Sequence, residues 1–103
     1  LVVWTGDNPP HDDWLTGLGV EAQRETQLNA TRLVAGMIQE ALPGVPVFPA
    51  IGNHAAFPVD FFEGDHGGSA WLMEATAREW ARWLPPDAAA SAARDGYYTA
   101  TFG

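Results

Sequence analysis

The sequence contains no cysteine and no lysine, and these absences narrow the kinds of site that it can form. Without cysteine, the chain cannot form a disulfide, a thiolate zinc site or a cysteine nucleophile. The chain has five arginines and thirteen acidic residues, so its formal net charge is −8. An acidic chain without a basic cluster is poorly suited to bind nucleic-acid phosphates. We find no apolar run that approaches a membrane span and no targeting signal within these residues.

What is present is the composition of one small folded domain. Hydrophobic residues make up 47% of the chain, charged residues make up 17%, and five tryptophans supply large apolar side chains for a core. A length of 103 residues leaves no room for two domains. The first and last residues fall in strand-like stretches, so we expect residues 1–103 to be an internal segment of a larger domain.

The order of the expected elements indicates an α/β fold. Hydrophobic spacing predicts a buried strand at 1–4, a helix over 20–42 and a second strand over 45–50. Pro46 and Pro49 predict either an edge position or irregular pairing for the second strand, because proline cannot donate to a sheet ladder. A strand, a helix and a strand within about 50 residues form a βαβ unit, so the two strands should be parallel.

Further helices are expected after this unit. The sequence predicts a helix over 69–84 with Ser69 as its N-cap, a short helix over 87–94, and an extended stretch over 97–102. Three tryptophans recur at helical spacing and are expected to pack in the core: Trp71, Trp80 and Trp83. The first helix is expected to bury an apolar face formed by Ala30, Leu33, Val34, Met37, Ile38, Ala41 and Leu42.

Polar side chains follow both predicted strands. Asp7 comes after the first strand, and Asn53 and His54 come after the second, each group preceded by a glycine. The carboxyl ends of parallel strands lie at one edge of a sheet, so a helical crossover should bring these side chains together. His11 lies four residues after Asp7 in the same loop. Two imidazoles, a carboxylate and an amide at one edge suit metal-assisted phosphoryl chemistry.

Simpler interpretations of these residues stay open. Gly-Asp and Gly-Asn after a strand can serve only to shape a turn. His66 lies in a glycine-rich loop expected over 55–68, and we expect no catalytic role for it. Several acidic residues are most simply a solvated surface, namely Asp12, Asp13, Asp60, Glu63 and Asp65.

The segments around the two motifs resemble acid sphingomyelinase and the acid-sphingomyelinase-like phosphodiesterases, within the calcineurin-like metallophosphoesterases. The resemblance covers nearly the whole chain. It implies part of a metallophosphoesterase-type β-sandwich flanked by helices. The matching segments are TGDNPPHD at 5–12, PVFPAIGNH at 46–54, PVDFF at 58–62, WLMEA at 71–75, Trp80, WLP at 83–85 and GYY at 96–98.

The resemblance also implies roles for individual residues. Asp7 matches the carboxylate that bridges two zinc ions, and Asn53 matches an amide ligand of the second zinc. His11 and His54 match histidines that contact the phosphate and protonate the leaving group. The implied reaction is hydrolysis of a phosphodiester or phosphoanhydride by metal-activated water, with a phospholipid headgroup, a nucleotide or a polyphosphate chain as substrate. Such enzymes are typically secreted or lysosomal glycoproteins, which would give the glycosylation sequon at Asn29 a use.

The chain departs from the family pattern in two ways. Ala55 stands where the family usually has an acidic or small polar residue after Gly-Asn-His. The upstream Asp-x-His and the downstream Gly-His-x-His of the family do not occur in these 103 residues, so we expect the isolated segment to be inactive. Membrane-surface association is expected only through regions outside it. The alternatives are a truncated, non-catalytic relic and a small acidic interaction module without metal.

Overall fold

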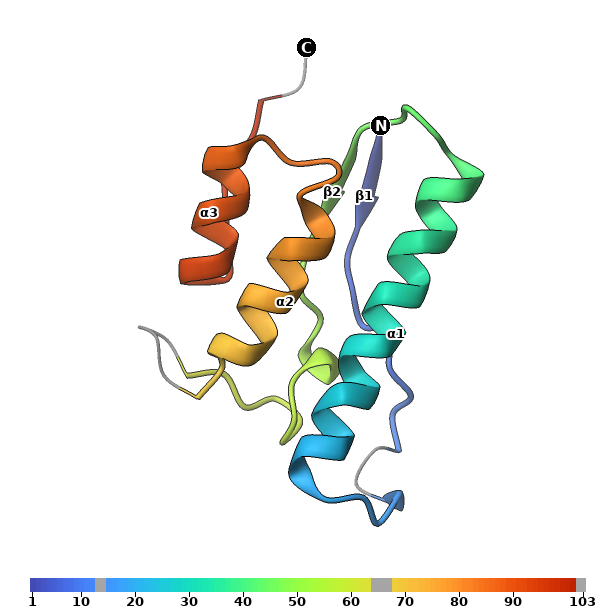
Figure 1. Cartoon of the computed structure of the whole chain (residues 1–103), viewed down its shortest axis with the longest axis vertical. Helices are drawn as coiled ribbons and strands as arrows, with labels where there is room; N and C mark the ends of the chain where they lie inside the picture. The colour runs from blue at the N-terminus through green and yellow to red at the C-terminus, as the bar shows by residue number, and fades with distance from the viewer. Residues whose placement is uncertain (13–14, 64–67, 102–103) are drawn as a thin grey trace.

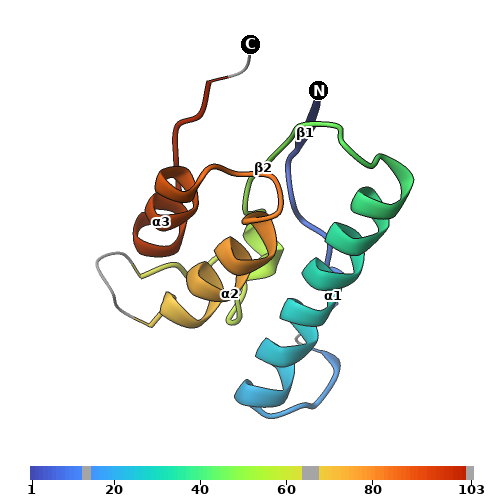
Figure 2. The same cartoon turned by 45° about the horizontal axis from the view of Figure 1, so that its top comes forward.

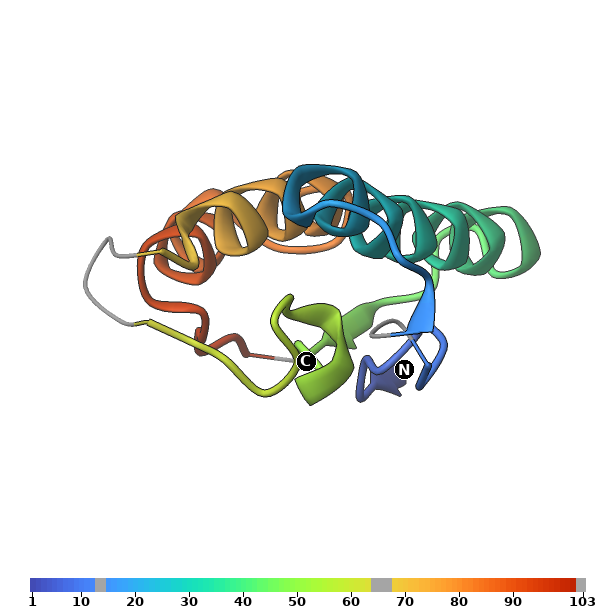
Figure 3. The same ribbon diagram turned by 90° about the horizontal axis from the view of Figure 1, so that it is seen from below.

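The molecule is a two-layer α/β structure, which a computed structural model describes for residues 1–12, 15–63 and 68–101. Three helices lie side by side in one layer, and two short strands lie beneath them (Figures 1 and 3). The mixed α/β class is therefore confirmed. In chain order, the elements are β1 (Val2–Trp4), α1 (Val20–Ala41), β2 (Val47–Pro49), the 3-10 helix η2 (Asn53–Ala55), α2 (Ala70–Trp80) and α3 (Pro86–Asp95).

The two strands pair in parallel, as the βαβ pattern predicts. Val2 is opposite Val47 and Trp4 is opposite Pro49, and α1 connects the end of β1 to the start of β2. Among the described residues the sheet has two strands, and each of them has one unpaired edge. The prediction that the first strand is buried is wrong, because the helices cover one face of the sheet and Val3 on that strand is 69% exposed.

Helix α1 has the expected length but not the expected buried face. It ends at Ala41, one residue before the predicted end, and Pro43-Gly44 follow it. Leu33 and Met37, from the predicted apolar face, are 64% and 59% exposed. The side that faces η2 and α2 is instead mostly polar and carries Gln23, Gln27, Thr31 and Ala35.

The packing of this polar side explains why the predicted buried face of α1 is wrong. Amide side chains can be buried when their donors and acceptors are hydrogen-bonded, and the buried glutamines of α1 are bonded to one another and to η2. On the apolar side, Leu33, Met37 and Leu42 stay exposed, so its spacing alone could not locate the core.

Helices α2 and α3 form most of the apolar core. α2 ends at Trp80, before the predicted 84, because the chain turns there toward Pro85. α3 ends at Asp95, and its C-cap Gly96 has a φ of +79°, a conformation that glycine adopts easily. Trp80 is buried in the core cluster, Trp83 packs against that cluster with its ring edge-on to Trp4 at 6.3 Å, and Trp71 packs against a second buried cluster. The packing role predicted for these three tryptophans is therefore confirmed. The core cluster comprises Ala77, Trp80, Leu84, Ala88 and Ala92.

Ser69 stands at the N-cap of α2, as the sequence predicts, but its hydroxyl does not cap the helix and accepts a hydrogen bond from the Glu63 N–H at 2.8 Å. Residues 97–101 follow α3 without a helix and without pairing to a strand of the described sheet. They rise away from α3 (Figure 2), and the Tyr98 hydroxyl donates to the Pro49 carbonyl at 2.9 Å. No helix in the described ranges is long and apolar enough to cross a membrane.

Candidate active site

Two glycine turns build the site, one after each strand. Gly6 has a φ of +76°, and a side chain there would run into the backbone of Ala50 and Gly52. A side chain at Gly52 would in turn run into the backbone of Asp7. The two turns therefore touch backbone to backbone, which requires glycine on both sides. This contact brings Asp7 beside η2 although the two are far apart in the sequence.

The carboxylate of Asp7 is the centre of the site. Its Oδ1 accepts a hydrogen bond from the His54 backbone N–H at 2.9 Å, and its Oδ2 lies 3.1 Å from His11 Nε2. The His54 N–H lowers the pKa of Asp7 most, and the two imidazoles lower it further against the opposing effect of burial. Asp7 adopts a φ of +65°, which aspartate tolerates better than most residues. Asp7 is thus held as a charged carboxylate.

The two histidines lie face to face. The rings of His11 and His54 stack with their centroids 3.7 Å apart and an angle of 11° between their planes. The Nδ1 atom of His54 is buried and has no hydrogen-bond partner among the described residues. His11, His54 and Asp7 each present a ligand atom, and these atoms lie within 4.8 Å of one another. The structure therefore brings together three of the four side chains that the sequence predicts at this edge.

The fourth residue, Asn53, begins η2 next to His54. Its amide nitrogen donates to Asp60 Oδ1 at 2.7 Å, and the Asp60 N–H donates to the Asn53 carbonyl at 3.3 Å. This pairing turns the amide nitrogen toward Asp60 and leaves the amide oxygen as an acceptor. The sequence predicts a position on a solvated surface for Asp60. It is exposed, as expected, but it also orients Asn53, and no local pattern signals a contact between residues seven apart in a loop.

Helix α1 also holds the site, through residues that sequence reasoning missed. Gln27 Nε2 donates to the His54 carbonyl at 2.6 Å, and Arg24 Nε donates to the Phe57 carbonyl at 3.1 Å. The Arg24 guanidinium lies over the ring of Trp71, 4.9 Å from its centroid. The available signal was the recurrence of polar residues at 23, 27 and 31, which share one side of the helix.

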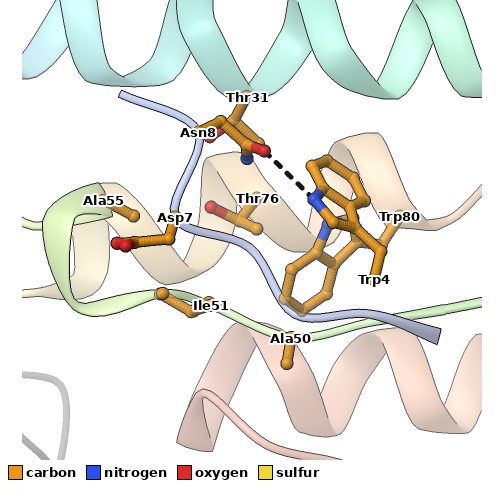
Figure 4. A pocket seen from close by; sticks show the side chains of 10 residues that line it. Trp4, Asp7, Asn8, Thr31, Ala50, Ile51, Ala55, Thr76 and Trp80 are labelled. Carbon is orange, nitrogen blue, oxygen red and sulfur yellow. Dashed lines mark hydrogen bonds between the residues drawn. The ribbon is translucent and has the colours of Figure 1, made fainter. Parts of the chain in front are cut away.

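A small cavity of about 10 Å³, which is about the space of one water molecule, lies behind the turn that carries Asp7. Figure 4 shows the Asp7 carboxylate pointing away from the two tryptophans that line it, Trp4 and Trp80. Trp4 Nε1 donates to Asn8 Oδ1 at 3.0 Å, which fixes the residue that follows Asp7. The tryptophans of this cavity therefore lie on the side of the turn opposite the Asp7 carboxylate.

The donors at this edge fit a divalent metal ion. A carboxylate has about four lone-pair sites, and Asp7 uses one on each oxygen for its two partners. The Asn53 amide oxygen and the unpartnered Nδ1 of His54 add an oxygen and a nitrogen donor. Oxygen and imidazole donors are typical of zinc sites, but four residues are too few for two closed zinc sites. His66, which we expect to have no catalytic role, lies outside the described residues.

The chain is similar in sequence to several known phosphodiesterases. No family model matches the chain. The chain is 41% identical over 103 residues to the sphingomyelin phosphodiesterase of Homo sapiens, covering 95% of this chain and 15% of that protein. It is 40% identical over 99 residues to sphingomyelin phosphodiesterase A of Dictyostelium discoideum, covering 96% of this chain and 16% of that protein. It is 34% identical over 99 residues to the cyclic GMP-AMP phosphodiesterase of Bos taurus, covering 96% of this chain and 20% of that protein.

Proposed function

Since this chain belongs to the sphingomyelin phosphodiesterase family and spans about 15% of the length of its sphingomyelin phosphodiesterase relatives, we propose that it supplies one side of the active site of a longer, metal-dependent phosphodiesterase. The chain would then be an internal segment of a metallophosphoesterase domain, and its two strands would belong to a larger sheet. Further metal ligands would come from sequence outside these residues. The substrate would be a phosphodiester, either a phospholipid headgroup or a nucleotide.

One observation carries this proposal. Asp7, His11 and His54 come from two turns after two parallel strands, and their ligand atoms gather within 4.8 Å. A turn that served only to reverse the chain would need neither a charged carboxylate nor two stacked imidazoles at its tip. The lowered pKa of Asp7 keeps the carboxylate charged, which is the state that binds a cation.

Each side chain has a task in the proposed reaction. Asp7 and Asn53 would hold zinc through their oxygens, with Asn53 oriented by Asp60. Zinc, when bound, neutralises phosphate oxygens and lowers the pKa of a water molecule to about 7. His11 and His54 donate hydrogen bonds to the phosphate oxygens, and one of them transfers its proton to the leaving oxygen. The ring stack fixes the two imidazoles in one orientation relative to Asp7.

The proposed family role also bears on where the protein acts in the cell and whether it is glycosylated. The family resemblance favours secretion or delivery to the lysosome, where the Asn29 sequon could be glycosylated. Asn29 is exposed on α1, although its side-chain oxygen accepts a hydrogen bond from Arg32 at 3.0 Å. Nothing in these residues chooses between a lipid and a nucleotide, so the substrate must be assigned by assay.

The test uses the full-length protein, with bis(4-nitrophenyl) phosphate, sphingomyelin and cyclic GMP-AMP as substrates. We expect zinc-dependent hydrolysis that a chelator abolishes and added zinc restores. Asp7→Asn should lower kcat/KM by more than the roughly 100-fold loss that follows removal of an outer partner of a metal ligand. Asp12→Asn is the matched control, because it removes an exposed carboxylate from the same loop, and it should stay within about twofold of the wild type.

Two results would contradict the proposal. One is a folded, zinc-loaded protein that hydrolyses none of the three substrates, as expected of a non-catalytic relic. The other is equal activity in the Asp7→Asn and Asp12→Asn variants, since the carboxylate at the centre of the site would then have no part in the reaction.

A further inference from the structure

A row of hydrogen bonds runs along the buried side of α1 and ends at the site. The Thr16 hydroxyl donates to Gln23 Oε1 at 2.6 Å, Gln23 Nε2 donates to Gln27 Oε1 at 3.0 Å, and Gln27 Nε2 donates to the His54 carbonyl at 2.6 Å. Gln23 is 1% exposed and Gln27 is 0% exposed. Two fully buried amides are costly unless they are hydrogen-bonded, so their bonds constrain how this part of the molecule packs.

The row has a fixed direction. Gln27 accepts from Gln23 through its oxygen, so its nitrogen must point at the His54 carbonyl. If the Gln27 amide were turned over, its oxygen would face that carbonyl and two acceptors would be buried against each other. The helix therefore presents a donor, in one orientation, to one atom of η2.

The His54 backbone is held on both sides by these contacts. Its N–H donates to Asp7 across the sheet edge, and its carbonyl accepts from Gln27 on α1. Arg24, one turn earlier on α1, holds the Phe57 carbonyl at the other end of the same loop. Segment 53–57 is thus held between the turn after β1 and one side of α1, and the rigid helix supplies its reference position.

We propose that Gln27 is a positioning residue for the active site, and that it acts by holding the His54 carbonyl so that Asn53 and His54 stay opposite Asp7. The inference rests on the proposed function, because positioning has a catalytic meaning only if these side chains bind metal and phosphate. Reacting groups that are misplaced by about 1 Å can cost roughly 100-fold in rate, so a hydrogen bond that fixes this turn matters to the chemistry.

The competing explanation is that Gln27 only fills space between α1 and η2. Gln27→Met separates the two, because methionine has a similar length and volume but no donor. In the full-length enzyme we expect Gln27→Met to lower kcat by about 10- to 100-fold with little change in KM, and to weaken zinc binding by a similar factor. Gln39→Met, near the other end of the same helix, is the matched control and should leave both within about twofold.

Hydrogen–deuterium exchange gives a readout that needs no turnover. Loss of the Gln27 bond should speed amide exchange across 53–57 by several-fold, while exchange in β2 stays unchanged. If Gln27→Met does not fold, Gln23→Met tests the same row one step further away, and it should produce smaller changes of the same kind.

Unchanged exchange across 53–57 together with unchanged zinc affinity in Gln27→Met would overturn the proposal and leave Gln27 as a packing residue. A wild-type protein that binds zinc but hydrolyses nothing would overturn the proposed function instead. The zinc titration and the exchange rates would still decide whether Gln27 holds the turn, so the two failures can be told apart.

Discussion

Gly52 offers the sharpest test of how the two turns assemble the site. A methyl group added there by Gly52→Ala would lie 2.5 Å from Asp7 Cα and 2.7 Å from Asp7 Cβ, whereas ordinary contacts begin at 3.4 Å. The Asp7 backbone nitrogen is closer still, and none of these atoms is the far end of a flexible side chain, so the two turns must separate by at least about 0.9 Å to admit the methyl group. Forcing a methyl into a packed contact of this kind costs about 1–3 kcal/mol.

The separation of the two turns in Gly52→Ala should also lower the catalytic activity. The Asp7–His54 hydrogen bond is 2.9 Å long, and an added separation of about 0.9 Å would take it beyond hydrogen-bonding distance. Asp7 would also shift relative to Asn53 and the two imidazoles. Since a misplacement near 1 Å costs roughly 100-fold, we expect Gly52→Ala to lower kcat/KM by about two orders of magnitude.

The assay compares Gly52→Ala with Gly36→Ala in the full-length enzyme, by hydrolysis of bis(4-nitrophenyl) phosphate and by thermal unfolding. Gly36 lies in α1, where an added methyl group meets nothing within 4 Å, so alanine there should stabilise the protein by about 0.4–1 kcal/mol and leave activity unchanged. Wild-type activity and stability in Gly52→Ala would refute the reasoning, because the close contact between the turns would then have no consequence.

Three further predictions follow from the same geometry. Asp60→Ala removes the acceptor that orients the Asn53 amide, so zinc affinity measured by chelator competition should fall about 10- to 100-fold, while Asp60→Asn, which keeps an acceptor oxygen, should bind nearly as well as the wild type. The pKa of Asp7 is lowered in the folded state, so its contribution to stability is present above its unfolded pKa of about 3.9 and is lost as the pH falls through the lower folded value. The stability difference between metal-free wild type and Asp7→Asn should therefore vanish in strong acid, and a difference that persists there would contradict this assignment. The isolated 103-residue chain should hydrolyse no bis(4-nitrophenyl) phosphate, and measurable turnover would show that it needs no outside ligands.

The convergence of the site could be predicted from the sequence because topology decides it. Once a strand, a helix and a strand form a right-handed unit, the two strand ends must meet, whatever the side chains in between do. Asp7 and His54 therefore lie in contact, as expected, and the glycines before each motif allow the close approach. His11 joins them because it lies only four residues after Asp7 in the same loop.

The buried side of α1 could not be predicted in the same way. Its apolar residues predicted a core face, but which side of a helix is buried depends on what packs against it, and here Gln27 meets η2 while Leu33 faces outward. The pairing of Asn53 with Asp60 depends on the path of a loop with no periodic pattern. Such contacts arise from tertiary structure, so the spacing of residues along the chain does not predict them.

The position of zinc in a crystal of the full-length protein, located by anomalous scattering at the zinc edge, tests the proposed metal site most directly. We expect a zinc ion with an Asp7 carboxylate oxygen and the Asn53 amide oxygen among its ligands, at about 2.0–2.2 Å. Zinc bound elsewhere, with Asp7 still paired only to His11 and the His54 N–H, would contradict it.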